Sequence, residues 1–150
     1  MEKGLLHLHS ILRWVILILL LASIYTTYIA TNLKHKKIWL YTLIACHTTL
    51  LIGLYQTYNY YQRITTDVPL GMKDIMKNKL YRFYIIEHPI MMVLGILLVT
   101  IAYSSTKRAK YKRASVLFII ALIIIVAAVP WPFRGIQEGI ARPWLPGMGG

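Results

Sequence analysis

Residues 5–30 read LLHLHSILRWVILILLLASIYTTYIA, an almost unbroken apolar run. The run is long enough to cross a membrane, since about 20 helical residues at 1.5 Å each span about 30 Å of hydrocarbon. Similar runs follow at Ile38–Tyr60, Leu80–Tyr103 and Ala114–Phe133. Each span must be helical, because lipid offers no partner to unpaired backbone groups. We therefore predict an all-α fold, an integral membrane four-helix bundle.

Composition excludes the common soluble classes. Of the 150 residues, 57% are hydrophobic and 15% are charged, whereas an average soluble domain is about 45–50% apolar and about 25% charged. A soluble fold of this length could not bury so much apolar surface, which excludes both an ordinary soluble enzyme and a disordered chain. The length suits one transmembrane domain over residues 1–150. The single cysteine, Cys46, excludes a disulfide within the chain.

Positive charge is concentrated in two short loops. The chain has 17 Lys and Arg against 5 Asp and Glu, a formal net charge of +12. The loops at 34–37 and 107–113 contain no acid, so the positive-inside rule predicts that both are cytoplasmic. Successive helices are then antiparallel in an up-down order, and both termini, the 61–79 loop and a C-terminal arm at 134–150 face outward. We assign this charge to topology and anionic lipids, and not to nucleic acid.

Ionisable side chains inside a span are costly and need a reason. The first span contains His9 and Arg13, the second His47, and the third Glu87 and His88, while Arg134 follows the fourth. His9 and Arg13 share one helix face, because positions i and i+4 stack. The three histidines lie on three helices, in the outer half to the middle of the bundle. If they face inward, they converge.

Three kinds of chemistry suit histidines from different helices. Haem b takes two axial imidazoles and an apolar slot, with arginines such as Arg13, Arg82 and Arg134 for its propionates. A copper or zinc site could use His7, His9, Glu87 and His88. A proton or quinone site could use Glu87 and His88 as relay groups. Structural interpretations stay open as well, with the histidines as interhelical hydrogen-bonding residues and Glu87 as an ion-pair partner of Arg13.

Four motifs carry a family resemblance. They are LHLHSILRW at 6–14, CHTTLLIGL at 46–54, RFYIIEHPIMM at 82–92 and VPWPFR at 129–134. Together they resemble a family of small bacterial four-helix membrane proteins labelled cytochrome b-like. The resemblance implies haem b in the bacterial inner membrane. The haem would be bound non-covalently, since the sequence has no CxxCH motif for covalent attachment. It points to these residues: His9, Arg13, Trp14, His47, Glu87, His88, Trp131 and Arg134. A weaker likeness links the chain to the haem-binding membrane protoporphyrinogen oxidases.

The favoured function is haem b binding for electron transfer, with quinone as a second candidate ligand or with a larger respiratory complex as the setting. Expected partners are membrane lipids, other membrane subunits or a second copy of the chain. The alternatives are a non-catalytic accessory subunit and a membrane copper or zinc protein. The two candidate pairs of axial ligands are His88 with His9 and His88 with His47. His88 belongs to both, and the choice between His9 and His47 as its partner stays open. Whether the protein is an enzyme also stays open.

Overall fold

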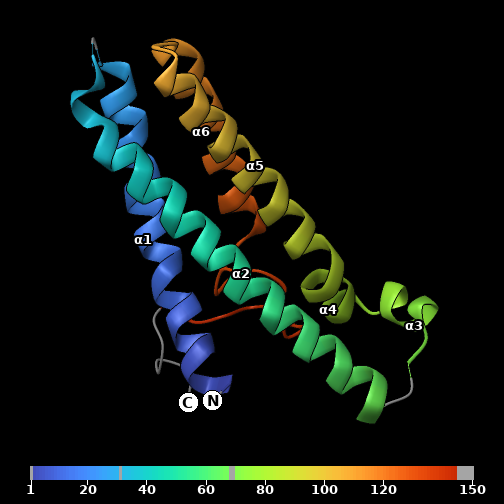
Figure 1. Ribbon diagram of the computed structural model, residues 1–150. Coiled ribbons are helices and arrows are strands. Elements are labelled where there is room, and N and C mark those ends of the chain that lie inside the picture. Colours follow the sequence, from blue (N-terminus) through green and yellow to red (C-terminus); the bar gives the residue numbers. More distant parts are fainter. Residues whose placement is uncertain (1, 31, 68–69, 145–150) are drawn as a thin grey trace.

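The computed structural model describes residues 2–30, 32–67 and 70–144, which contain helices and no strand (Figure 1). Four apolar helices within these ranges are long enough to cross a membrane. They are α1 (Glu2–Tyr28), α2 (Lys36–Asp67), a continuous helix Lys79–Lys107 and α6 (Tyr111–Ala128). The continuous helix consists of α4 (Lys79–Arg82), the π-helical turn η2 (Phe83–Glu87) and α5 (His88–Lys107). Two short helices complete the order, η1 (Leu33–His35) and α3 (Met72–Lys77).

The long helices form one bundle in which consecutive helices run in opposite directions (Figure 1). Helix α1 packs on α2 and α6, and α5 packs on the same two helices. This arrangement puts α1 and α5 on opposite corners of the bundle. The start of α1, the end of α2 and α4 therefore gather at one end, and the two Lys-rich connections lie at the other (Figure 1).

The side chains are distributed as lipid requires. Small and hydroxyl residues lie at the contacts between helices. At Gly95 the helices α5 and α6 approach so closely that an added Cβ would lie only 2.8 Å from Cγ1 of Ile125. The hydroxyls of Ser23 and Thr42 lie 2.7 Å apart between α1 and α2. Large aliphatic side chains such as Leu51 point outward. With four apolar helices of this kind, the chain has the architecture of a multi-pass membrane protein.

The helix ends differ from the expected runs. Helix α2 continues to Asp67, seven residues beyond the expected end at Tyr60, so the 61–79 segment is largely helical and not an open loop. Helix α6 stops at Ala128 instead of Phe133. The cause is Pro130, which disfavours helical backbone at the preceding residue. Val129 is accordingly extended, with φ −66° and ψ 133°.

A proline also explains the π-helical turn in the third long helix. Pro89 has no N–H to donate, and its ring crowds the carbonyl four residues earlier, at Ile85. The helix widens over Phe83–Glu87, and the N–H of His88 donates to the carbonyl of Phe83, five residues back. Such turns rotate the residues that follow them. His88 is the first residue after the turn.

Candidate functional site

A cavity of about 640 Å³ opens at the end of the bundle where α1 begins and α2 ends. Side chains from α1, α2, the third long helix and α6 line it, and the segment after α6 closes one side. The volume falls in the range of about 300–1,000 Å³ that is typical of cofactor and ligand pockets. Its wall is mostly apolar, with a few polar groups placed among the apolar ones.

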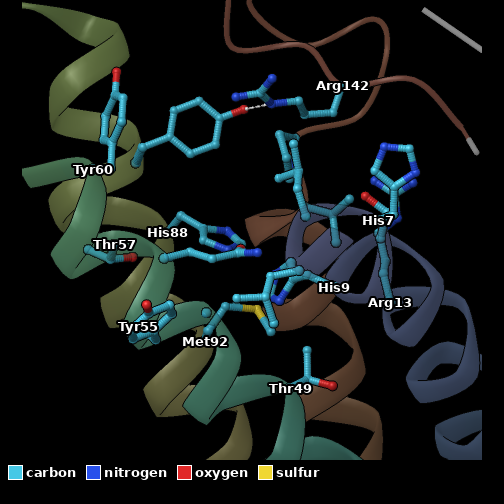
Figure 2. Close-up of a pocket in the computed structure, with 18 of the residues that line it drawn as sticks. His7, His9, Arg13, Thr49, Tyr55, Thr57, Tyr60, His88, Met92 and Arg142 are labelled. Carbon is cyan, nitrogen blue, oxygen red and sulfur yellow. Dashed lines mark hydrogen bonds between the residues drawn. The ribbon is translucent and has the colours of Figure 1, made fainter. Parts of the chain in front are cut away.

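Two of the predicted histidines meet in this cavity. His9 from α1 and His88 from α5 have ring centroids 6.4 Å apart and ring planes 73° apart. Both rings point into the cavity, together with Met92 (Figure 2). The two helices occupy opposite corners of the bundle, so the imidazoles meet across its centre. This pair is the centre of the candidate site.

The orientation of His88 is set by the end of α6. Its Nδ1 lies 2.8 Å from the carbonyl oxygen of Ala128, the last residue of that helix. A carbonyl can only accept, so Nδ1 carries the proton and Nε2 keeps its lone pair. Terminal helix carbonyls lack a partner within the helix, which leaves this one free for the imidazole. A histidine held by one nitrogen with the other left available is the arrangement found in metal-binding histidines.

The surroundings of His9 leave it room and an unused nitrogen. Its Nδ1 is buried and has no hydrogen-bond partner. A Cβ added at Gly53 on α2 would lie 3.1 Å from Cε1 of this imidazole, so the missing side chain makes space for the ring. Met92 is buried beside both histidines.

His47 does not join the other two histidines, because it does not face inward and the condition for all three to converge is therefore not met. Its side chain is exposed on the outer face of α2, and its Nδ1 donates to the carbonyl of Leu43 one turn earlier, at 2.9 Å. The apolar residues on both sides of it gave no signal for its direction. Of the two candidate partners for His88, the structure brings only His9 to it.

Glu87 and Arg134 also lie elsewhere than expected. Glu87 forms an ion pair with Arg82 on α4 and accepts a 2.7 Å hydrogen bond from its Nε, so the pairing with Arg13 that the sequence had left open is not the one formed. Arg134 donates to the carbonyl of Ala127 and stands over the ring of Phe83, with 5.0 Å from Cζ to the ring centroid. It therefore caps the end of α6, where a cation is favoured by the helix dipole.

Arg13 lines the cavity and also holds the segment that follows α6. One of its terminal nitrogens donates to the carbonyls of Pro143 and Trp144, at 3.2 and 2.7 Å. Nε1 of Trp14 donates to the same Trp144 carbonyl at 2.9 Å. The indoles of Trp14, Trp131 and Trp144 pack together. The expected arm at 134–150, described as far as Trp144, thus folds back onto α1.

A salt bridge secures the middle of the same segment. Nζ of Lys79 lies 3.0 Å from Oε1 of Glu138. The hydrogen bond from Lys79 lowers the pKa of the Glu138 carboxyl below its ordinary value. Both side chains are solvent-accessible, so this pair contributes little stability by itself. Its role is to place the segment beside α4.

The cavity mouth contains groups that sequence reasoning missed. Nε of Arg142 donates to the hydroxyl of Tyr84 at 2.8 Å (Figure 2), and that hydroxyl donates to the carbonyl of Ile140 at 2.6 Å. Arg63 and Tyr60 also line the cavity. Arg142 lies 54 residues beyond His88 in the sequence, and no local pattern links the two.

No protein-family model, curated protein or solved structure matches the chain. Within the described ranges, no three His, Cys, Asp or Glu side chains gather as a metal-binding group. A closed structural zinc site uses four such ligands, and the two imidazoles alone do not form one. They form a pair with an open space around it.

We expect Arg13→Leu to release the C-terminal segment from α1. Two hydrogen bonds from a charged donor are lost, each with a net value of about 1.5–3 kcal/mol. The measurement is acrylamide quenching of tryptophan fluorescence in detergent, which should become stronger as Trp144 leaves the indole cluster. Arg113→Leu, which removes the same charge at the start of α6, is the matched control. Equal quenching in both variants would contradict the role of Arg13.

Proposed function

We propose that the protein is a haem b-binding membrane protein that transfers electrons, with His9 and His88 as the axial ligands. The observation that supports this most strongly is the pair of imidazoles that meet inside the bundle, with ring centroids 6.4 Å apart. The hydrogen bond from His88 to the Ala128 carbonyl adds to it, since it leaves Nε2 available to iron.

The dimensions of the pair suit one iron atom. Two imidazole nitrogens that bind a metal ion from opposite sides lie about 4 Å apart, since each bond is about 2.0–2.1 Å, and the ring centres lie roughly 2 Å further apart. The observed separation of the ring centroids is 6.4 Å. The cavity of about 640 Å³ adds an apolar space beside the pair. The residues present therefore fit a haem with two axial histidines.

Each residue then has a defined task. Haem b would supply one-electron chemistry, whose potential depends on axial ligands, hydrogen bonding and burial. His88 is held in one tautomer by Ala128, and His9 has the space left by Gly53. Mostly apolar side chains line the cavity around the pair. A membrane partner or a quinone is the natural electron donor or acceptor, because the chain has little mass outside its helices.

We further propose that the cavity opens to the outer face of a bacterial inner membrane. This follows from the positive-inside rule, because the Lys-rich connections lie at the opposite end of the bundle. A periplasmic alkaline phosphatase reporter fused after Gly150 should be active, and one inserted in the 107–113 loop should be inactive. The opposite pattern would contradict this orientation.

Pigment and metal content test the proposed function. The protein, purified in detergent from haem-replete cells, should contain about one haem per chain and show a Soret band with a low-spin reduced spectrum. Elemental analysis of the same sample should find iron at the same ratio. Colourless protein without metal would favour the accessory-subunit alternative and contradict the haem proposal.

One observation favours a second candidate, a copper site. Met92 is buried beside His9 and His88, and thioether and imidazole ligands together suit Cu(I). Copper at about one per chain, without haem, would support this candidate. The large cavity around the pair favours haem, because a lone ion needs no such space.

A further inference from the structure

We infer that the exposed face of α2 around His47 is the surface through which two copies of this chain associate in the membrane. In this dimer, the His47 imidazole of each copy accepts a hydrogen bond from the Thr48 hydroxyl of the other copy. This surface is separate from the proposed haem site, since neither His47 nor Thr48 lines the cavity.

His47 lies near the middle of the membrane. It follows Lys36, the first residue of α2, by 11 residues, which is about 16 Å at 1.5 Å per residue. The hydrocarbon core is about 30 Å thick, so this distance reaches its centre. The His47 side chain is exposed, and α2 packs its other faces on α1 and α5. An imidazole in this position faces lipid unless another protein covers it, and a polar side chain in lipid is costly.

The other long helices present aliphatic side chains to lipid at the same depth. The exposed residues there are Ile18 on α1, Leu97 on α5 and Ile123 on α6. On α2 the exposed residues at this depth are His47 and Thr48, both of them polar. Polar side chains at this depth mark contacts between helices. The face of α2 is therefore the one that another membrane helix covers.

His47 and Thr48 present one acceptor and one donor. Nδ1 of His47 donates to the carbonyl of Leu43 at 2.9 Å, so Nε2 has a free lone pair and can only accept. Thr42 and Thr49 on the same helix donate to carbonyls four residues earlier, at 2.9 and 2.8 Å. Within the described part of the chain Thr48 forms no such bond, so its hydroxyl still has a proton to donate.

A second copy of the chain satisfies both groups at once. Copies inserted in one orientation are related by a two-fold axis along the membrane normal, which places α2 parallel to α2 of the other copy and equal residues at equal depth. His47 and Thr48 differ in depth by only about 1.5 Å. The acceptor of each copy therefore meets the donor of the other, and the two hydrogen bonds are equivalent. Such a self-complementary surface is what a two-fold interface requires.

The apolar side chains beside this pair complete the surface. Ile44 and Leu51 lie three and four positions from His47, on the same helix face. They are 52% and 69% exposed. In the dimer they pack against the same residues of the other copy, so the polar pair lies within an apolar contact. Leu51 is therefore a suitable position for a cross-link between the two copies.

Cysteine cross-linking in native membranes tests which face is covered. Leu51→Cys, in a chain whose own cysteine is removed by Cys46→Ala, should give a disulfide-linked dimer on oxidation with copper phenanthroline. Ile18→Cys, Leu97→Cys and Ile123→Cys, at exposed positions of the other three helices, are the matched controls and should give little dimer. A Leu51→Cys chain that is linked to a different protein would overturn a second copy as the partner.

Energy transfer between copies tests the two hydrogen bonds. Donor and acceptor fluorophores are fused after Gly150, and transfer is measured in lipid vesicles over a range of protein-to-lipid ratios. Thr48→Val keeps the size of the side chain but removes the donor, and it should weaken association about tenfold, because two interhelical hydrogen bonds are lost. His47→Leu should have the same effect. Thr48→Ser retains a hydroxyl and should associate like the unaltered chain.

The outcomes separate this dimer from the proposed function. Absence of energy transfer at every ratio would overturn the dimer. Association that is unchanged by Thr48→Val and His47→Leu would overturn the hydrogen bonds as its basis. A dimeric protein without haem would contradict the proposed function alone, and a monomer with haem would contradict the dimer alone. The helix content of each variant, measured by circular dichroism, must match that of the unaltered protein.

Discussion

We expect His88→Ala to abolish haem binding, with a fall in affinity of about 100-fold or more. The substitution removes the imidazole that the Ala128 carbonyl orients, and it leaves His9 without the second ring of the pair. The measurement is haem content per chain after purification, together with the spectrum after added haem. His88→Ala should lack the low-spin spectrum under both conditions.

His47→Ala is the matched control for this prediction. It removes the same side chain from the interior of a long helix, but His47 is exposed and does not line the cavity. We expect its haem content and spectrum to equal those of the unaltered protein. An unchanged low-spin spectrum in His88→Ala, or loss of haem in His47→Ala, would refute the assignment of the ligands.

We expect Gly53→Leu to weaken haem binding by about tenfold or more through the position of His9. A side chain at this point starts 3.1 Å from Cε1 of the imidazole, and the rest of the leucine must then occupy the space of the ring. The low-spin fraction should fall, while the helix content measured by circular dichroism stays the same.

Gly4→Leu is the corresponding control, because it is also a helical glycine and a Cβ there has nothing within 4 Å. That variant should bind haem like the unaltered protein. A Gly53→Leu protein with normal affinity and spectrum would show that His9 needs no space on α2. The proposed ligand pair would then lose its support from packing.

Hydropathy predicted the helices well because backbone N–H and C=O groups without a partner are very costly in lipid, so that an apolar span must be helical. The prediction of four long apolar helices is confirmed by α1, α2, the Lys79–Lys107 helix and α6. Their ends were less predictable. Tyr61 and the polar residues that follow it lower the hydropathy without stopping α2, while Pro130 stops α6 within an apolar run.

The direction of the polar side chains was harder to predict than their presence. The other residues on the helix face of His47, which are Leu43, Leu50 and Leu51, are all apolar, so periodicity could not distinguish a lipid-facing position from a buried one. The direction of His88 depends on the π-helical turn before Pro89, which shifts the helical phase. Assigning residues to a helix face by a spacing of three or four positions does not take such a shift into account.

The cavity mouth was beyond sequence reasoning for a different reason. It depends on the return of the C-terminal segment, which Arg13 holds through backbone carbonyls. Backbone acceptors have no sequence signature, since every residue supplies one. In the sequence Arg142 therefore belonged only to an outer C-terminal arm, although its guanidinium donates to Tyr84 at the mouth.

Electron paramagnetic resonance of the oxidised protein tests the central claim most directly, because it reports on both axial ligands of the iron at once. The account predicts a low-spin ferric signal from two imidazoles at one haem per chain. The signal should be strongly anisotropic, since the ring planes of His9 and His88 differ by 73°. It should be absent from His9→Ala and His88→Ala and present in His47→Ala. A high-spin signal, or a two-imidazole signal that persists without His9, would contradict the account.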